Sequence, residues 1–234
     1  RPPRSTLFPY TTLFRSAPAE WTAYMNAESL QSGGARILIT GGSGFIGTNL
    51  VERLRLAGCS VMSLDIRPPD YGPHSSIHVT ADLLDAGHVA STVLEFGPTH
   101  VVHLPARTDL VGGEAEVEYA VNTLGCRNLV AALSEVPGLQ RCVFSSSKLV
   151  CRNGYLPRDS ADYCADTVYG KSKVAMEQEL QRMLRTQYSW CIVRPTSIWG
   201  RLFGVPYRGC FLSIARGRYW HLGSVDPSRS FGYV

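Results

Sequence analysis

A glycine-rich turn between a short apolar run and a helical stripe is the feature that most constrains this chain. Arg36–Thr40 (RILIT) predicts a buried strand, and glycines at 41, 44 and 47 follow it within Thr40–Gly47 (TGGSGFIG). Apolar residues then recur at helical spacing as far as Ala57, before Gly58. Glycine lets the backbone turn tightly off a strand and lets a helix start close to the sheet. We therefore expect the fold to begin with a βα unit.

The same alternation of apolar runs and helical stripes continues along the chain. Six strands are predicted at 36–40, 60–65, 77–80, 100–104, 141–146 and 190–198, and four helices at 44–57, 85–96, 114–135 and 167–187. Strands that alternate with helices of this length are typical of βαβ units, whose crossovers place the strands in parallel. The predicted fold class is α/β, a Rossmann-type doubly wound parallel sheet with helices on both faces.

The glycine spacing also predicts a ligand. Backbone N–H groups at the start of a helix bind phosphate, so Gly41, Gly44, Phe45, Ile46 and Gly47 are expected to hold the pyrophosphate of a dinucleotide. Asp65 ends the next predicted strand, where a carboxylate can accept hydrogen bonds from ribose hydroxyls and repel a 2′-phosphate. We therefore predict NAD as the cofactor. Two alternatives stay open: Arg67 could serve a 2′-phosphate, and the glycines could form only a structural turn.

Composition argues against several other classes of protein. The net charge is +4, but three arginines lie in the first sixteen residues, and without them 20 basic residues face 19 acidic ones. We therefore expect no nucleic-acid partner. No apolar run reaches the roughly 18–20 residues that span a bilayer, so no membrane association is predicted. The seven cysteines include no C-x-x-C pair, which favours reduced thiols in the cytoplasm and no metal site.

A tyrosine and a lysine lie four residues apart in the predicted helix 167–187. At this spacing Tyr169 and Lys173 share one helix face, and an ammonium beside a phenol lowers the pKa of the phenol. Ser147 ends the run Ser145–Ser147 after the fifth predicted strand, at the edge where a doubly wound sheet binds its ligand. This serine can bind the same substrate oxygen that Tyr169 protonates or deprotonates.

These motifs, taken in order, resemble those of the extended short-chain dehydrogenases/reductases, in particular the NAD-dependent epimerase/dehydratase family. The resemblance covers about residues 35–234 and rests on segments 40–47, 65, 82–83, 103–106, 122, 145–147, 169–173 and 194–196. It implies a seven-stranded Rossmann domain followed by a small domain that binds a nucleotide sugar. Pro105 departs from the family pattern, which usually has alanine there, and removes a backbone donor near the cofactor.

The resemblance implies a role for each matching residue. The catalytic residues would be Ser147, Tyr169, Lys173 and Asn122, although Asn122 could equally be a structural polar residue. Tyr169 would be the acid/base, and Lys173 would bind the nicotinamide ribose. The remaining cofactor contacts would come from the strand ends, at Asp82, Leu83, Leu104, Ala106 and Thr196.

The implied activity is an NAD-dependent epimerase that acts on a nucleotide sugar by transient hydride transfer. The stretch after Ser147 lacks the acidic residue that relatives use for dehydration or decarboxylation, which favours epimerisation or simple oxidoreduction. Two alternatives remain: an NAD(P)-dependent reductase or dehydrogenase, and a non-catalytic protein that binds the dinucleotide as a sensor. Relatives pair through the helices at 114–135 and 167–187, so a homodimer is also expected.

The two ends of the chain differ from its middle. Residues 6–16 (TLFPYTTLFRS) resemble a translated sequencing adapter, so we expect residues 1–34 to be non-native or disordered. Residues 35–198 are predicted to form the NAD-binding Rossmann domain. Residues 199–234 are predicted to begin a substrate domain, with loops and a short helix, that is truncated together with the last strand of the sheet.

Overall fold

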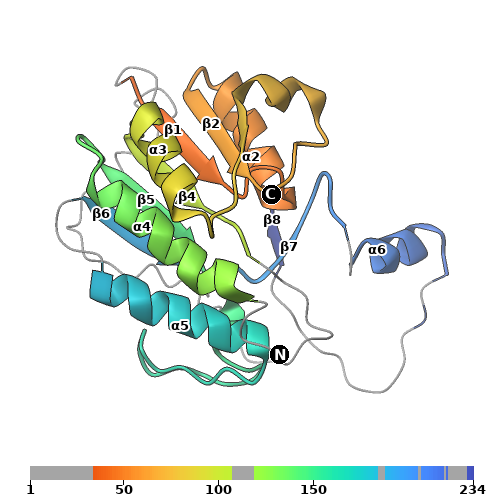
Figure 1. The fold of residues 1–234 in the computed structure, drawn as a ribbon. Coiled ribbons are helices and arrows are strands. Elements are labelled where there is room, and N and C mark those ends of the chain that lie inside the picture. Colours follow the sequence, from red (N-terminus) through yellow and green to blue (C-terminus); the bar gives the residue numbers. More distant parts are fainter. Residues whose placement is uncertain (1–33, 107–118, 184–187, 205–206, 219, 221–230) are drawn as a thin grey trace.

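The computed structural model describes residues 34–106, 119–183, 188–204, 207–218, 220 and 231–234. Six parallel strands form one sheet in the order β3-β2-β1-β4-β5-β6 (Figure 1). This order and the parallel pairing confirm the predicted doubly wound fold. The strands are β1 (Arg36–Thr40), β2 (Ser60–Asp65), β3 (His78–Thr80), β4 (His100–His103), β5 (Arg141–Ser145) and β6 (Ser189–Val193).

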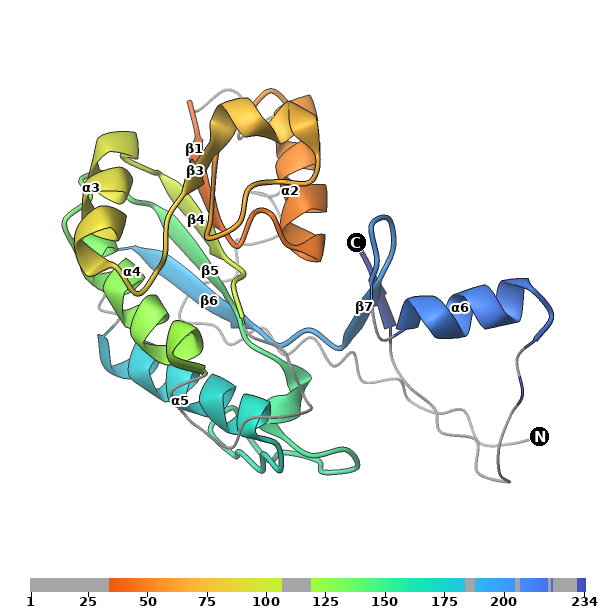
Figure 2. The same cartoon turned by 45° about the vertical axis from the view of Figure 1, so that its right-hand side comes forward.

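Helices cover both faces of this sheet. Figure 2 shows α2 on one face and α3, α4 and α5 on the other. The chain moves from β1 outward to β2 but from β3 back across to β4, and right-handed crossovers in opposite directions place helices on opposite faces. The helices are α2 (Phe45–Leu56), α3 (Ala86–Phe96), α4 (Cys126–Ser134) and α5 (Val168–Met183), with short turns η2 (Gly72–Ile77), η4 (Val121–Gly125) and η5 (Lys148–Val150).

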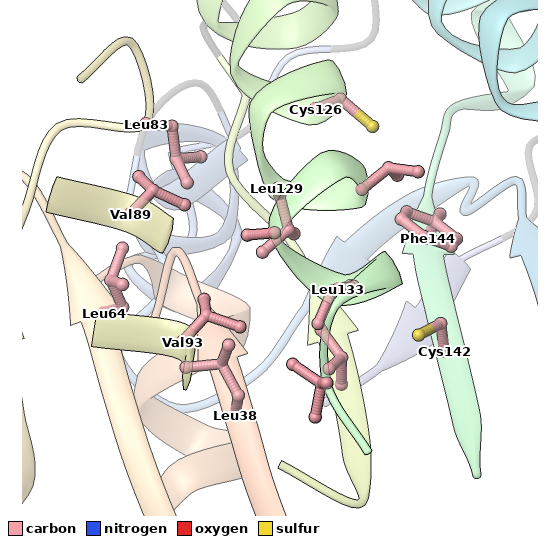
Figure 3. Packing of buried hydrophobic residues seen from close by; sticks show 14 of the residues in the cluster. Leu38, Leu64, Leu83, Val89, Val93, Cys126, Leu129, Leu133, Cys142 and Phe144 are labelled. Carbon is pink, nitrogen blue, oxygen red and sulfur yellow. The ribbon is translucent and has the colours of Figure 1, made fainter. Parts of the chain in front are cut away.

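The larger core lies between the sheet and helices α3, α4 and α5. Leu129 and Leu133 of α4 point into it, and they meet Leu38 of β1, Val93 of α3 and Phe144 of β5 (Figure 3). All five side chains are almost completely buried. Burial of each such side chain contributes roughly 1.5–3 kcal/mol. A smaller cluster on the other face packs α2 against β1 and β2. The two clusters hold the strand ends, and therefore the site, in place.

The prediction of a single strand over 190–198 was wrong. The structure divides it into β6 and a short strand β7 (Ser197–Trp199). Pro195 has no N–H to donate, so the ladder cannot continue through it. The β7 strand pairs in parallel with β8 (Phe231–Tyr233), away from the main sheet, and α6 (Tyr207–Ala215) is the short helix expected in this region.

Several predictions fall on parts of the chain that the structure does not describe. Residues 1–33 lie outside the described residues, and so do 107–118, which include the start of the helix predicted at 114–135. In the described part of that segment, a π-helical turn η4 precedes α4. The division into a Rossmann domain and a partial substrate domain stays a prediction. No helix among the described residues has the length and apolar character needed to cross a membrane.

Candidate functional site

The predicted site residues converge at the carboxyl edge of the sheet, near the pair β1 and β4. These strands are neighbours, and the chain leaves them toward opposite faces and opposite edges. Ligands of open α/β sheets bind at such a point, because the loops diverge and leave a crevice. The glycine loop after β1 and the turn after β4 meet there: a Cβ atom on Gly41 would lie 2.7 Å from the backbone nitrogen of Pro105.

The glycine loop requires its glycines. Gly41 has a φ of +74°, which favours glycine, and its N–H donates to the carbonyl of Leu64 at 2.8 Å. A Cβ atom on Gly47 would lie 2.2 Å from the carbonyl oxygen of Gly41. A side chain there would push α2 away from β1. The structure therefore agrees with a turn that brings the start of a helix against the sheet.

The start of α2 has the properties of a phosphate site. No side chain caps this helix, and no acidic residue lies in its first turn, around Phe45 and Ile46. The first N–H groups of a helix carry a partial positive charge, and they attract a phosphate when no side chain occupies them. The loop therefore fits the pyrophosphate of a dinucleotide.

Asp65 lies beside the glycine loop at the end of β2. Its carboxylate accepts from the N–H of Ser43 at 3.1 Å and from the N–H of Arg67 at 3.1 Å. The hydroxyl of Ser43 donates to the carbonyl of Arg67 at 2.8 Å. A carboxylate has about four acceptor positions, so these two backbone bonds leave capacity for ribose hydroxyls.

The other predicted cofactor residues lie at the same edge in different environments. Asp82 is half-buried, and its carboxylate accepts from the N–H of Leu84 at 2.9 Å. The side chain of Leu83 is buried in the larger core, close to Gly125. Three further residues, half-buried, follow strand ends: Leu104, Ala106 and Thr196.

Two buried polar atoms at this edge have no partner among the described residues. They are the hydroxyl of Ser146, just after β5, and Nε2 of His103, the last residue of β4. The other ring nitrogen of His103 lies 2.8 Å from the hydroxyl of Thr40. Burial, aided by the charge of Lys173, lowers the pKa of His103 to about 3. This imidazole is therefore neutral at neutral pH.

The structure brings together Ser147 and Tyr169, the two residues that the sequence predicts to act on the substrate oxygen. Both side chains are buried, and the Ser147 hydroxyl lies close enough to Tyr169 to affect its pKa. Burial raises the pKa of Tyr169 above its ordinary value, and the neighbouring Ser147 hydroxyl opposes that rise. The sequence predicts a lowered pKa through the neighbouring Lys173, but in the protein alone the pKa of Tyr169 is raised on balance. Burial is the larger effect there, because it removes water from the phenolate.

Lys173 is fully buried one turn further along α5. Its ammonium donates to the carbonyl of Ser145 at 2.9 Å. Burial lowers the pKa of Lys173 to about 8, while Cys126 and Glu177 oppose this effect. A buried cation beside the end of β5 can bind a ribose hydroxyl and favour negative charge nearby.

Asn122 is also buried, and it lies within the π-helical turn η4. Its side-chain amide donates to the hydroxyl of Ser172 at 2.9 Å, and that hydroxyl donates to the carbonyl of Tyr169 at 2.7 Å. Single π-helical turns are common at functional sites. The structure therefore brings Asn122 to the backbone that carries Tyr169, as one link of a hydrogen-bonded chain.

Sequence reasoning missed Glu177, which lies one turn after Lys173 on the same face of α5. Glu177 forms a buried ion pair with Arg194, whose side chain is 12% exposed. The spacing of four residues from Lys173 was the available signal, but a glutamate in a helix is more often solvated. Among the described residues, no group of three or more His, Cys, Asp or Glu side chains is arranged to hold a metal ion.

Comparison with known proteins agrees with this geometry. The model of the NAD dependent epimerase/dehydratase family matches residues 37–234, which is most of the chain. The chain belongs to this family. NAD is accordingly the cofactor that the glycine loop and Asp65 fit.

Individual relatives are similar to the chain at about 30% identity. A 3-beta-hydroxysteroid dehydrogenase of Mycolicibacterium neoaurum is 31% identical over 90% of this chain and 60% of its own length. A UDP-glucose 4-epimerase of Vibrio cholerae is 29% identical over 82% of this chain and 61% of its own. The enzyme WbmG of Bordetella bronchiseptica, solved with NAD and UDP, superposes with a TM-score of 0.69 at 27% identity. That match covers 85% of this chain and 65% of WbmG. The chain therefore spans about three fifths of the length of these curated relatives.

Proposed function

We propose that this chain binds NAD at the crevice between β1 and β4 and oxidises a secondary alcohol reversibly, with Tyr169 as acid/base. The observation that carries this proposal is that Ser147 and Tyr169 are adjacent and both buried. When bound, NAD supplies the acceptor for the hydride that leaves the alcohol carbon. The chain supplies binding, orientation and proton transfer.

Each residue of the site then has a task. The hydroxyl of Ser147 orients the substrate oxygen, and the Tyr169 phenolate takes its proton as the C–H bond breaks and the C=O bond forms. Burial raises the pKa of Tyr169, so the phenolate needs positive charge nearby. Lys173, fully buried and one turn away, is the cationic side chain in position to supply it. Asn122 and Ser172 fix the backbone carbonyl of Tyr169.

The substrate we propose is a nucleotide sugar, and the reaction its epimerisation. After oxidation, the keto sugar would turn and accept the hydride on its other face, which leaves NAD unchanged overall. The similarity to a UDP-glucose 4-epimerase and to an enzyme solved with NAD and UDP supports this proposal. The absence of an acidic residue directly after Ser147 supports it too, because elimination of water needs a further proton shuttle.

The second candidate is a dehydrogenase with a net oxidation. The similarity to a 3-beta-hydroxysteroid dehydrogenase favours it, since that relative matches 90% of this chain. The same Ser147 and Tyr169 geometry would serve a sterol hydroxyl as well as a sugar hydroxyl. The two candidates differ in whether NADH accumulates.

The test uses the full chain with UDP-glucose, UDP-galactose and a 3β-hydroxysteroid in separate reactions. Each reaction contains NAD below the substrate concentration, with NADH followed by absorbance and the products by NMR. We expect conversion between the two UDP-sugars without accumulation of NADH. Stoichiometric NADH with one substrate would instead favour the dehydrogenase. No product with any substrate, in a chain that binds NAD by calorimetry, would count against both.

Two further expectations belong to this proposal. We propose a homodimer through α4 and α5, which size-exclusion chromatography with light scattering would test. All seven cysteines are free thiols, as a reducing cytoplasm would keep them, and the cytoplasmic location stays a proposal.

A further inference from the structure

A buried ion pair lies behind the reactive residues and has no part in the function proposed so far. Arg194, just after β6, binds Glu177 of α5 through both carboxylate oxygens, at 2.9 Å and 2.6 Å. The side chain of Glu177 is only 1% exposed. A buried ion pair is a weak source of stability, because both charges lose their hydration. Stability alone therefore does not explain why this ion pair is buried here.

The position of Glu177 on α5 supplies one. Tyr169, Lys173 and Glu177 follow one another at intervals of four residues, so they form a single buried row along the helix. Glu177 is thus the next charged side chain beyond the Lys173 ammonium. The glutamate raises the pKa of Lys173, against the larger effect of burial.

The groups that face Lys173 from the neighbouring elements carry no competing negative charge. On α4, burial raises the pKa of Cys126 to about 12, so its thiol is protonated. On β4, the pKa of His103 is about 3, so its imidazole is neutral. The β5 strand offers the Ser145 carbonyl. Glu179 of α5 acts on Cys126, and it forms its own ion pairs with Arg127 and Arg182. Just after β6, Arg194 adds a positive charge on the far side of Glu177.

The same ion pair also fastens the segment 151–164, which leads from Ser147 toward Tyr169. Arg194 donates to the carbonyl of Ser160 at 2.7 Å, and its guanidinium lies 5.2 Å from the centre of the Tyr163 ring. The hydroxyl of Tyr163 donates to Glu177 at 3.0 Å. The ion pair therefore joins α5, the end of β6 and this segment.

We propose that Glu177, held by Arg194, is a positioning residue that keeps Lys173 charged and fixes the segment 151–164 against α5. The proposal rests on the proposed function and deepens it, because it names what sustains the cation beside Tyr169. It does not require Glu177 to touch the cofactor or the substrate. Arg194 orients the Glu177 carboxylate, which favours the charged form of Lys173. The Lys173 ammonium in turn favours the phenolate of Tyr169.

The chain offers a direct measurement, since it contains only three lysines: Lys148, Lys171 and Lys173. In the full chain labelled with ¹³C at the lysine ε-carbons, NMR titration follows each ammonium separately. Glu177→Gln is expected to lower the titration midpoint of Lys173 by about one pH unit, because it removes the anion and leaves Arg194. Arg194→Gln is expected to raise that midpoint, because Glu177 loses its counter-charge. Lys148 and Lys171 serve as internal controls.

The opposite directions distinguish this role from a purely structural one. General loosening of the fold would let water reach Lys173 and raise its midpoint in both variants, which would overturn the proposal. An unchanged midpoint in both would overturn it equally. Arg194→Lys keeps the positive charge, so the titration midpoint of Lys173 in this variant should stay close to that of the parent protein. If Glu177→Gln fails to fold, Glu177→Asp replaces it, because the shorter side chain moves the carboxylate away from Lys173. A lower midpoint of Lys173 then supports the proposal, and a midpoint that rises, as loosening would cause, or stays unchanged overturns it. The titration needs no substrate, so it remains valid if the epimerase reaction itself is not found.

Discussion

The glycine loop and helix α5, which carries the proposed catalytic residues Tyr169 and Lys173, are stabilised by different interactions. The loop has no room for a side chain at Gly47, because a Cβ atom there would lie 2.2 Å from a backbone oxygen. Along α5, the decisive fact is the presence of buried charge, at Lys173 and Glu177. The loop should therefore be intolerant of added volume. A change of charge on α5 should leave the protein folded but should reduce its activity.

Tyr169→Phe should give the largest effect and the sharpest contrast. The phenylalanine keeps the ring in its buried place but removes the oxygen that accepts the substrate proton and returns it. We expect turnover to fall about 10²- to 10⁴-fold, with NAD affinity and melting temperature close to those of the parent. The measurement is the conversion of UDP-glucose under saturating NAD, beside calorimetry of NAD. A variant with full turnover would mean that another group moves the proton.

Gly47→Ala tests the opposite side of the comparison. The added methyl group must displace backbone, because Gly41 and Gly42 lie within 3 Å of it. We expect the free energy of unfolding to fall by about 1–3 kcal/mol and NAD affinity to fall at least tenfold, because the start of α2 moves from the sheet. Urea unfolding and calorimetry provide the two values.

Gly72→Ala is the matched control for this variant. A Cβ atom on Gly72 would have nothing within 4 Å, and this glycine begins the short turn η2. We expect the substitution to leave stability and NAD binding nearly unchanged. Equal losses in both variants would show that the close approach at Gly47 is not what the loop depends on.

The same contrast explains how much the sequence could predict. Glycine spacing, apolar periodicity and strand ends depend on local geometry, so the parallel sheet and the loop were predicted correctly. The boundary at Pro195 was missed because apolar residues on both sides of it look like one strand. Glu177 was missed because its burial depends on Arg194, a residue distant in the sequence. The predicted net lowering of the Tyr169 pKa was wrong for the protein alone, because spacing shows proximity but not the loss of water around both groups.

Lys173→Met should make the protein without cofactor more stable. Burial lowers the pKa of Lys173 from 10.5 to about 8, so the folded state binds fewer protons than the unfolded state between these values. The free energy of unfolding therefore rises as the pH increases from about 8 to 10.5, and the cost of the buried charge is fully present below about 8. That cost is about 3 kcal/mol. Since the bond to Ser145 is lost as well, we expect a net gain of about 2 kcal/mol at pH 7.

Thermal unfolding across this pH range tests the prediction. Lys171→Met, an exposed position on the same helix, is the control and should change stability little. The Lys173 variant should also lose NAD affinity, because the proposed contact of its ammonium with the ribose is lost. If Lys173→Met is instead less stable than the parent at pH 7, the buried charge stabilises the fold. The proposal that Lys173 lowers the stability of the protein would then be wrong.

Asp65→Asn should have the smallest effect, and it changes a site that depends on both backbone geometry and charge. The site at Asp65 combines loop geometry with one charge, since its carboxylate is held by the backbone N–H groups of Ser43 and Arg67. The asparagine keeps the shape and one acceptor oxygen but no longer repels a 2′-phosphate, and Arg67 is exposed nearby. We expect the preference for NAD over NADP to narrow about tenfold, which is about 1.4 kcal/mol. Calorimetry with both cofactors at two salt concentrations measures it. A preference that stays unchanged would assign cofactor choice to the shape of the loop, and the charge of Asp65 would then matter only for the turn.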